Sequence, residues 1–200
     1  MAGPGPIGVL GGSFNPPHLG HLVIASELCA RLELGRVLFV PAAAPPHKEI
    51  DDGVAAADRL EMTRLATADD ERFAASAVEI ELGLRYTADT LAELRRRHDG
   101  AELVFIVGSD TLLQLASWHE PEHVLALATM AVAHRPGDEP SAVAAAAERW
   151  GTRVRLVPTV GVDLSSSVVR DRVREGLPIR YLVPSAVERF IAEHGLYKVS

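Results

Sequence analysis

The feature that most constrains the fold is an alternation of short apolar runs with longer amphipathic stretches along the chain. Continuous apolar runs of this length are typical of strands buried on both faces. Strands separated by helices cross over right-handedly and form a parallel sheet. The sequence therefore predicts an α/β fold built on a doubly wound parallel sheet. The expected strands are residues 7–10, 37–40, 78–80, 103–107, 130–133 and 154–157, and the clearest helices are 19–32, 58–68 and 87–98.

Length and charge limit the classes of protein to which this chain can belong. A chain of 200 residues suits one core, so we expect a single domain over 1–200, with a C-terminal helical part at about 163–200. A net charge of −7 disfavours a broad nucleic-acid-binding face. With no apolar run long enough to span a bilayer and no signal peptide, we expect a cytoplasmic protein without a membrane partner. The single cysteine, Cys29, excludes an internal disulfide, and its apolar neighbours indicate burial.

A glycine turn follows the first predicted strand and leads into a helix. Gly11 and Gly12 let the backbone approach a ligand closely, and the amides of a helix start attract anions. His18 and His21, three residues apart, face one side of the first helical turn, and Gly20 leaves room for a bulky group such as a purine. The stretch matches neither a Walker loop nor a dinucleotide fingerprint. Spacing alone fits two unrelated surface histidines equally well.

Three serines, Ser165, Ser166 and Ser167, stand at the start of a later predicted helix, with Arg170 about one turn on. One serine is an ordinary helix cap, but three exceed the needs of one cap. Their hydroxyls, the helix amides and a guanidinium form an anion site suited to the β- and γ-phosphates of a nucleotide. The alternative for the arginines is a solvated face. The apolar residues expected on this helix are Val169, Val173 and Leu177.

The two segments resemble motifs of one family. His18-Leu19-Gly20-His21 resembles the (H/T)-x-G-H signature of the nucleotidylyltransferase superfamily, and the longer string 11–18 resembles bacterial nicotinate-nucleotide adenylyltransferases. Segment 164–170 resembles the I-S-S-T-x-I-R motif, with Leu164, Ser167 and Val169 as conservative departures. Further family-like pieces follow in order at 45–48, 86–91, 108–110, Trp118 and 135–137.

The resemblance implies a Rossmann-like nucleotidylyltransferase fold and adenylyl transfer from ATP to nicotinate mononucleotide. The products are deamido-NAD (nicotinate adenine dinucleotide) and pyrophosphate, in NAD biosynthesis. The residues implied as catalytic are His18, His21 and Arg170. Those implied to bind ATP are Gly11, Gly12, Ser13, Phe14, His18, Gly20, His21, Gly108, Asp110, Ser165, Ser166, Ser167 and Arg170. Those implied to bind the acceptor are His47, Lys48, Thr87, Trp118 and Arg135.

The chemistry expected of such a site is positioning and charge stabilisation. The acceptor phosphate is already an anion and needs no general base. Mg²⁺ arrives with ATP, and no tightly bound metal is expected. Taken one at a time, Lys48 fits a solvated lysine and Trp118 a core tryptophan equally well.

Three alternatives stay open at this point. One is another small-substrate adenylyltransferase that uses nicotinamide mononucleotide or phosphopantetheine, and another is a non-catalytic nucleotide-binding regulatory module. The third is a zinc hydrolase, because residues 119–123 match H-E-x-x-H, although Pro121 opposes a continuous helix there. The remaining histidines, His98, His134 and His194, are interpreted as structural. The oligomeric state is open, a homo-oligomer included.

Overall fold

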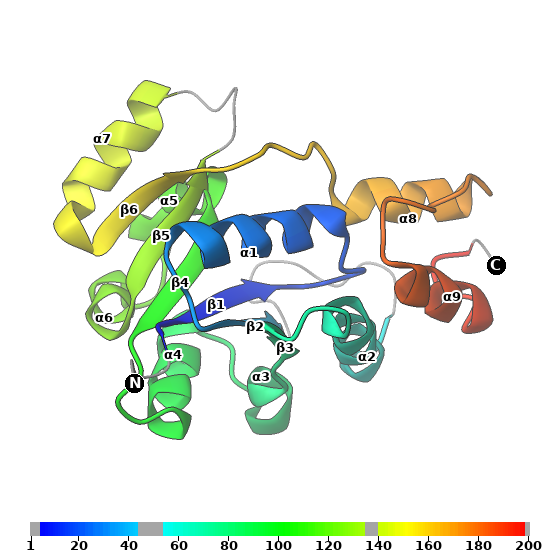
Figure 1. Ribbon diagram of the computed structural model, residues 1–200, viewed down its shortest axis with the longest axis horizontal. Coiled ribbons are helices and arrows are strands. Elements are labelled where there is room, and N and C mark those ends of the chain that lie inside the picture. Colours follow the sequence, from blue (N-terminus) through cyan, green and yellow to red (C-terminus); the bar gives the residue numbers. More distant parts are fainter. Residues whose placement is uncertain (1–4, 44–53, 135–139, 199–200) are drawn as a thin grey trace.

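The computed structural model describes residues 5–43, 54–134 and 140–198 and contains one parallel sheet of six strands in the order β3-β2-β1-β4-β5-β6 (Figure 1). Helices pack on both sides of it, so the predicted doubly wound sheet is confirmed. The strands are β1 (Ile7–Gly12), β2 (Arg36–Pro41), β3 (Phe73–Ala75), β4 (Leu103–Gly108), β5 (Thr129–His134) and β6 (Val154–Pro158).

Helices lie in every connection between successive strands, as a parallel sheet requires, and two more follow β6. Three were predicted to within two residues of their observed bounds: α1 (Leu19–Arg31), α2 (Ala56–Thr67) and α4 (Thr87–Arg97). The helices of the described chain are α1 (Leu19–Arg31), α2 (Ala56–Thr67), α3 (Val78–Leu82), α4 (Thr87–Arg97), α5 (Ser109–Gln114), α6 (Pro121–Leu127), α7 (Pro140–Trp150), α8 (Ser166–Arg174) and α9 (Ser185–Glu193), with 3-10 turns η1 (Leu115–Ser117) and η2 (Gly151–Arg153). None of the described helices is long and apolar enough to cross a membrane.

Alternate residues of the central strands face two separate cores. In β1, Ile7 and Val9 pack with α3 to α7, whereas Leu10 packs with α1 on the opposite face. This alternation explains why the strands read as continuous apolar runs, since neither face meets water. Cys29 of α1 is buried in the second of these cores, as predicted, and burial raises the pKa of its thiol.

One predicted strand is wrong. Residues 78–80 lie in helix α3, and the strand at this edge of the sheet is β3, which pairs with residues 37–39 of β2. The sequence from Val78 to Leu82 alternates apolar and acidic residues and so imitates a strand, but periodicity cannot separate the two in so short a segment. Gly83, with a left-handed φ of 65°, ends the helix.

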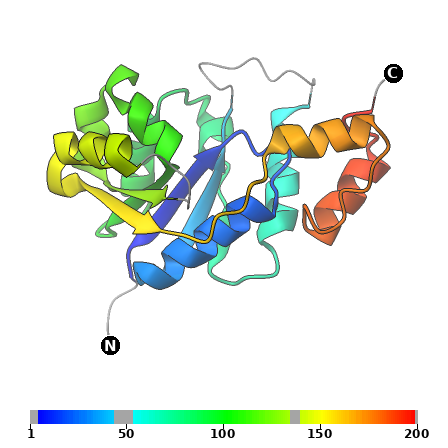
Figure 2. The same cartoon turned by 90° about the horizontal axis from the view of Figure 1, so that it is seen from above.

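The C-terminal part forms a third apolar cluster with α2. Val169 of α8 and Val187 and Ile191 of α9 are buried in it, together with Met62 of α2. Figure 2 shows α8 and α9 at one end of the molecule, beyond the sheet. The prediction that Leu177 belongs to this helix is wrong. Helix α8 ends at Arg174, and Gly176, with a left-handed φ of 69°, turns the chain before Leu177.

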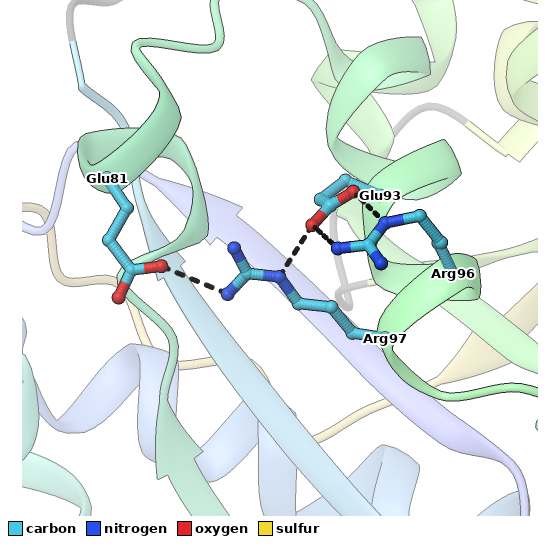
Figure 3. A network of polar contacts seen from close by, with 4 residues as sticks. All are labelled: Glu81, Glu93, Arg96 and Arg97. Atoms are coloured by element: carbon cyan, nitrogen blue, oxygen red, sulfur yellow. Dashed lines mark hydrogen bonds and ion pairs between the residues drawn. The ribbon is translucent and has the colours of Figure 1, made fainter.

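The basic run Arg95-Arg96-Arg97 closes α4, and nearby carboxylates pair with Arg96 and Arg97. Arg96 and Arg97 both donate to Glu93, at 2.7 and 2.8 Å, and Arg97 also donates to Glu81 at 3.0 Å (Figure 3). These hydrogen bonds lower the pKa of Glu93 to about 2. The run is therefore a solvated ion-pair network at a helix C-terminus, where cations are favoured.

Candidate active site

The turn after β1 has a strained backbone. Phe14 has a left-handed φ of 46°, which for a residue with a side chain costs about 1–3 kcal/mol. Its ring is buried and meets the His21 ring edge-on, with centroids 5.0 Å apart. The predicted ATP-binding residues Gly11 and Gly12 are the last two residues of β1 rather than part of a turn after it; Gly11 is exposed and Gly12 half-buried, and Ser13, just beyond the strand, is exposed. Backbone outliers of this kind cluster at active sites and ligand clamps.

The two predicted histidines lie together at the start of α1. His18 is the N-cap, His21 is in the first turn, and their rings stack with centroids 3.7 Å apart. The expectation that both face one side is confirmed. The His18 backbone N–H donates to His21 Nδ1 at 3.1 Å. A neutral ring that accepts at Nδ1 carries its proton on Nε2, so His21 can act as a donor there.

Gly20 is close to both motifs. A Cβ at this position would lie 3.0 Å from the His18 ring and 3.6 Å from the backbone oxygen of Leu164. In the structure, therefore, the His18 ring lies beside Gly20, and a purine at this position stays a prediction.

The serine segment and the histidine segment are in direct contact. Ser166 Oγ donates to the Pro16 carbonyl at 2.8 Å, and Arg170 donates to the Asn15 carbonyl at 2.9 Å. Ser165 caps α8 by accepting from the Val168 N–H at 3.3 Å. The two motifs, about 150 residues apart in the chain, are thus held against each other by hydrogen bonds. Each hydroxyl named here also has a structural role.

Gly108, Asp110, Thr87 and Trp118 lie on three further segments. Gly108 ends β4, and a Cβ there would lie 2.6 Å from Asp110 Oδ1, so a side chain at this position would require the exposed Asp110 carboxylate to move. Thr87 begins α4. Trp118 is half-buried and edge-on to Phe105 of β4, with centroids 6.0 Å apart, so part of it does pack on the core.

An aromatic contact joins the segments of Thr87 and Trp118. The rings of their neighbours Tyr86 and His119 lie 4.2 Å apart and are tilted by 33°. Both of these rings are exposed. The contact brings the start of α4 beside the segment that precedes α6.

Comparison with known proteins decides the family. The model described as Cytidylyltransferase-like matches residues 9–172. A protein of Thermomicrobium roseum named "Probable nicotinate-nucleotide adenylyltransferase" is 45% identical over 96% of this chain and 91% of its own length. One of the same name from Geobacter sulfurreducens is 42% identical over 95% of this chain and 97% of its own. This chain belongs to the nicotinate-nucleotide adenylyltransferase family.

Solved structures confirm the fold expected of the family. A Plasmodium falciparum nicotinic acid mononucleotide adenylyltransferase complexed with NaAD matches with a TM-score of 0.79 at 16% identity, over 96% of this chain and 97% of that one. So low an identity is evidence for the fold alone. The fold is the Rossmann-like nucleotidylyltransferase fold that the two motifs predicted.

Three residues predicted from the family resemblance, His47, Lys48 and Arg135, lie outside the described residues. Their assignment to the acceptor stays a prediction.

The H-E-x-x-H pattern at 119–123 does not form one helical segment. Helix α6 begins at Pro121, and Glu120 before it has a left-handed φ of 50°. The prediction that proline breaks this pattern is confirmed. Within the ranges that the structure describes, no group of three or more His, Cys, Asp and Glu side chains is arranged to hold a metal ion.

Two buried polar residues of the site were missed by sequence reasoning. Tyr197, near the C-terminus, donates to Asn15 Oδ1 at 2.7 Å. Arg59 is fully buried in α2, where it shares a helix face with Met62 and Ala66. An arginine on the apolar face of an amphipathic helix is a signal that the sequence does contain. No local sequence pattern indicates the contact of Tyr197 with Asn15, because the two residues are far apart in the chain.

Proposed function

We propose that this protein transfers the adenylyl group of ATP to nicotinate mononucleotide, giving deamido-NAD and pyrophosphate. The observation that carries the proposal is the direct contact of the histidine segment with the serine segment. Ser166 donates to the Pro16 carbonyl, and Arg170 donates to the Asn15 carbonyl. Separately each motif is an ordinary helix start. Together they offer stacked imidazoles, hydroxyls and a guanidinium to one polyphosphate.

The proposed reaction is a displacement at the α-phosphorus of ATP. A phosphate oxygen of the acceptor forms the new bond, the bond from the α-phosphorus to the bridging oxygen breaks, and pyrophosphate leaves with the electron pair. The acceptor is already anionic, so the protein stabilises charge rather than removing a proton. We assign the α-phosphate to His18 and His21, and the departing pyrophosphate to Ser165, Ser166 and Arg170.

Mg²⁺ belongs to this proposal as part of the substrate MgATP, bound to phosphate oxygens. We expect the purified protein to require Mg²⁺ for activity and to contain no tightly bound zinc. Metal analysis after dialysis tests the second expectation. Stoichiometric zinc that is lost from a His119→Ala, His123→Ala double variant would contradict it, because those two histidines would then be ligands.

The acceptor side of the proposal is assigned to Thr87 and Trp118, with His47, Lys48 and Arg135 by family resemblance. Tryptophan offers a flat apolar face to a pyridine ring. The backbone amides at the start of α4 favour a carboxylate, because hydrogen bonds to a charged group are about twice as strong as neutral ones.

We therefore expect kcat/KM for nicotinate mononucleotide to exceed that for nicotinamide mononucleotide by about tenfold or more, the equivalent of about 1.4 kcal/mol. Pyrophosphate release at matched MgATP, with both mononucleotides and phosphopantetheine as acceptors, measures the preference. A reversed ratio would make this a nicotinamide enzyme. Release with phosphopantetheine alone would favour that alternative, and release with none of the three would favour a regulatory module. A cytoplasmic location and the oligomeric state stay predictions.

A further inference from the structure

Arg59 of α2 connects the ends of two neighbouring strands beneath the candidate active site. Its side chain is 0% exposed. One terminal nitrogen donates to the Ser13 carbonyl at 2.8 Å, and the other donates to the carbonyls of Ala42 at 2.6 Å and Ala43 at 3.3 Å. Strands β1 and β2 end one residue before Ser13 and Ala42. The guanidinium therefore bridges the segments that leave β1 and β2, just beyond the last paired residues of these strands.

This arrangement is costly for an arginine. Burial lowers the pKa of Arg59, although Tyr197 and Glu79 oppose that shift. Among the described residues, no carboxylate forms an ion pair with Arg59. Taking a charge out of water costs several kcal/mol. The hydrogen bonds to three carbonyls at the strand ends offset that cost, so the charge is kept here together with the contacts it makes.

The contact of Arg59 with Ser13 lies next to Phe14, the residue whose ring contacts His21. Ser13 precedes Phe14, whose left-handed φ of 46° must be maintained by its surroundings. On the other side of Phe14, Asn15 is held by Arg170 through its carbonyl and by Tyr197 through its side chain. The strained residue is thus held on both sides, and its ring supports the His21 ring edge-on.

We propose that Arg59 is a positioning residue for adenylyl transfer: by bridging Ser13 and Ala42, it maintains the conformation of Phe14 that orients His21. The kinetic part of this inference rests on the proposed function. The structural part, the orientation of the His21 ring, does not.

The decisive variants are Arg59→Met, which removes the donors, and Arg59→Lys, which keeps a cation but replaces the planar fork by a point charge. The matched control is Thr63→Val. Thr63 is fully buried on the same helix, but its hydroxyl donates to the Arg59 backbone carbonyl within α2, at 2.7 Å, rather than to a strand end. We expect kcat, per folded molecule, to fall about tenfold or more in both Arg59 variants, since small misplacements of reacting groups are costly. Thr63→Val is expected to lower Tm with kcat unchanged.

A second measurement is independent of activity. The Hε1 resonance of His21, assigned by its absence from a His21→Ala variant, is expected to shift in Arg59→Met and Arg59→Lys but not in Thr63→Val. An unmoved His21 resonance in the Arg59 variants overturns the proposal, and so does an unchanged kcat. If Arg59→Met fails to fold, Arg59→Lys carries both measurements. A wild-type protein that releases no pyrophosphate with any acceptor would refute the proposed function, and the resonance would still test the role of Arg59.

Discussion

Replacing His18 or His21 by alanine is expected to lower kcat by about two to three orders of magnitude, the usual loss when a preorganised charge-stabilising donor is removed. The two rings stack at 3.7 Å between centroids, so loss of either also frees the other to move. Steady-state rates of pyrophosphate release at saturating MgATP and nicotinate mononucleotide measure the effect. Circular dichroism checks that each variant remains folded.

His21→Asn separates the two roles of this side chain. Its amide oxygen can still accept from the His18 N–H, as Nδ1 does at 3.1 Å, but the donor at Nε2 is lost. We expect it to be as slow as His21→Ala. A rate near that of wild type would mean that His21 only caps the helix. His98→Ala is the control, because His98 bonds to Arg36 away from the strand carboxyl ends and its loss should leave kcat unchanged.

Arg170→Ala is expected to lower kcat/KM for ATP by about 10²-fold. A hydrogen bond to a charged group is worth about 1.5–3 kcal/mol, and the variant loses both the contact proposed for pyrophosphate and the observed bond to the Asn15 carbonyl at 2.9 Å. Initial rates over a range of MgATP concentrations measure it. Inhibition by added pyrophosphate should weaken in parallel, because the same guanidinium is proposed to hold the leaving group.

Arg174→Ala is the matched control for Arg170. Arg174 lies on the same helix about one turn later and pairs with Asp171 at 2.6 Å. We expect kcat/KM for ATP to be unchanged in this variant. Unaltered dependence on ATP in Arg170→Ala would show that Arg170 does not bind the triphosphate, and that its bond to Asn15 is dispensable.

The sequence by itself determined the elements whose signal is local. Five of the six expected strands are present. The four inner ones leave a continuous apolar run because they are buried on both faces, as residues 103–107 are, whereas β6 lies at the edge of the sheet with Arg155 and Leu156 exposed. The pairing of His18 with His21 was also predictable, because three residues of helix bring two side chains to one face. The serine motif was recognisable as a helix start because serine is a favoured N-cap residue, and Ser165 does cap α8.

Tertiary structure decided what depends on segments far apart in the chain. Phe73–Ala75 becomes a strand because β2 offers it a partner, whereas the strand-like pattern at Val78–Leu82 forms a helix. The contacts of Arg170 and Tyr197 with Asn15 span more than 150 residues. The burial of Arg59 depends on where two strands end. Periodicity reports which face of an element is apolar, but the partner of that face, and the carbonyl that a buried guanidinium meets, depend on how the chain crosses in space.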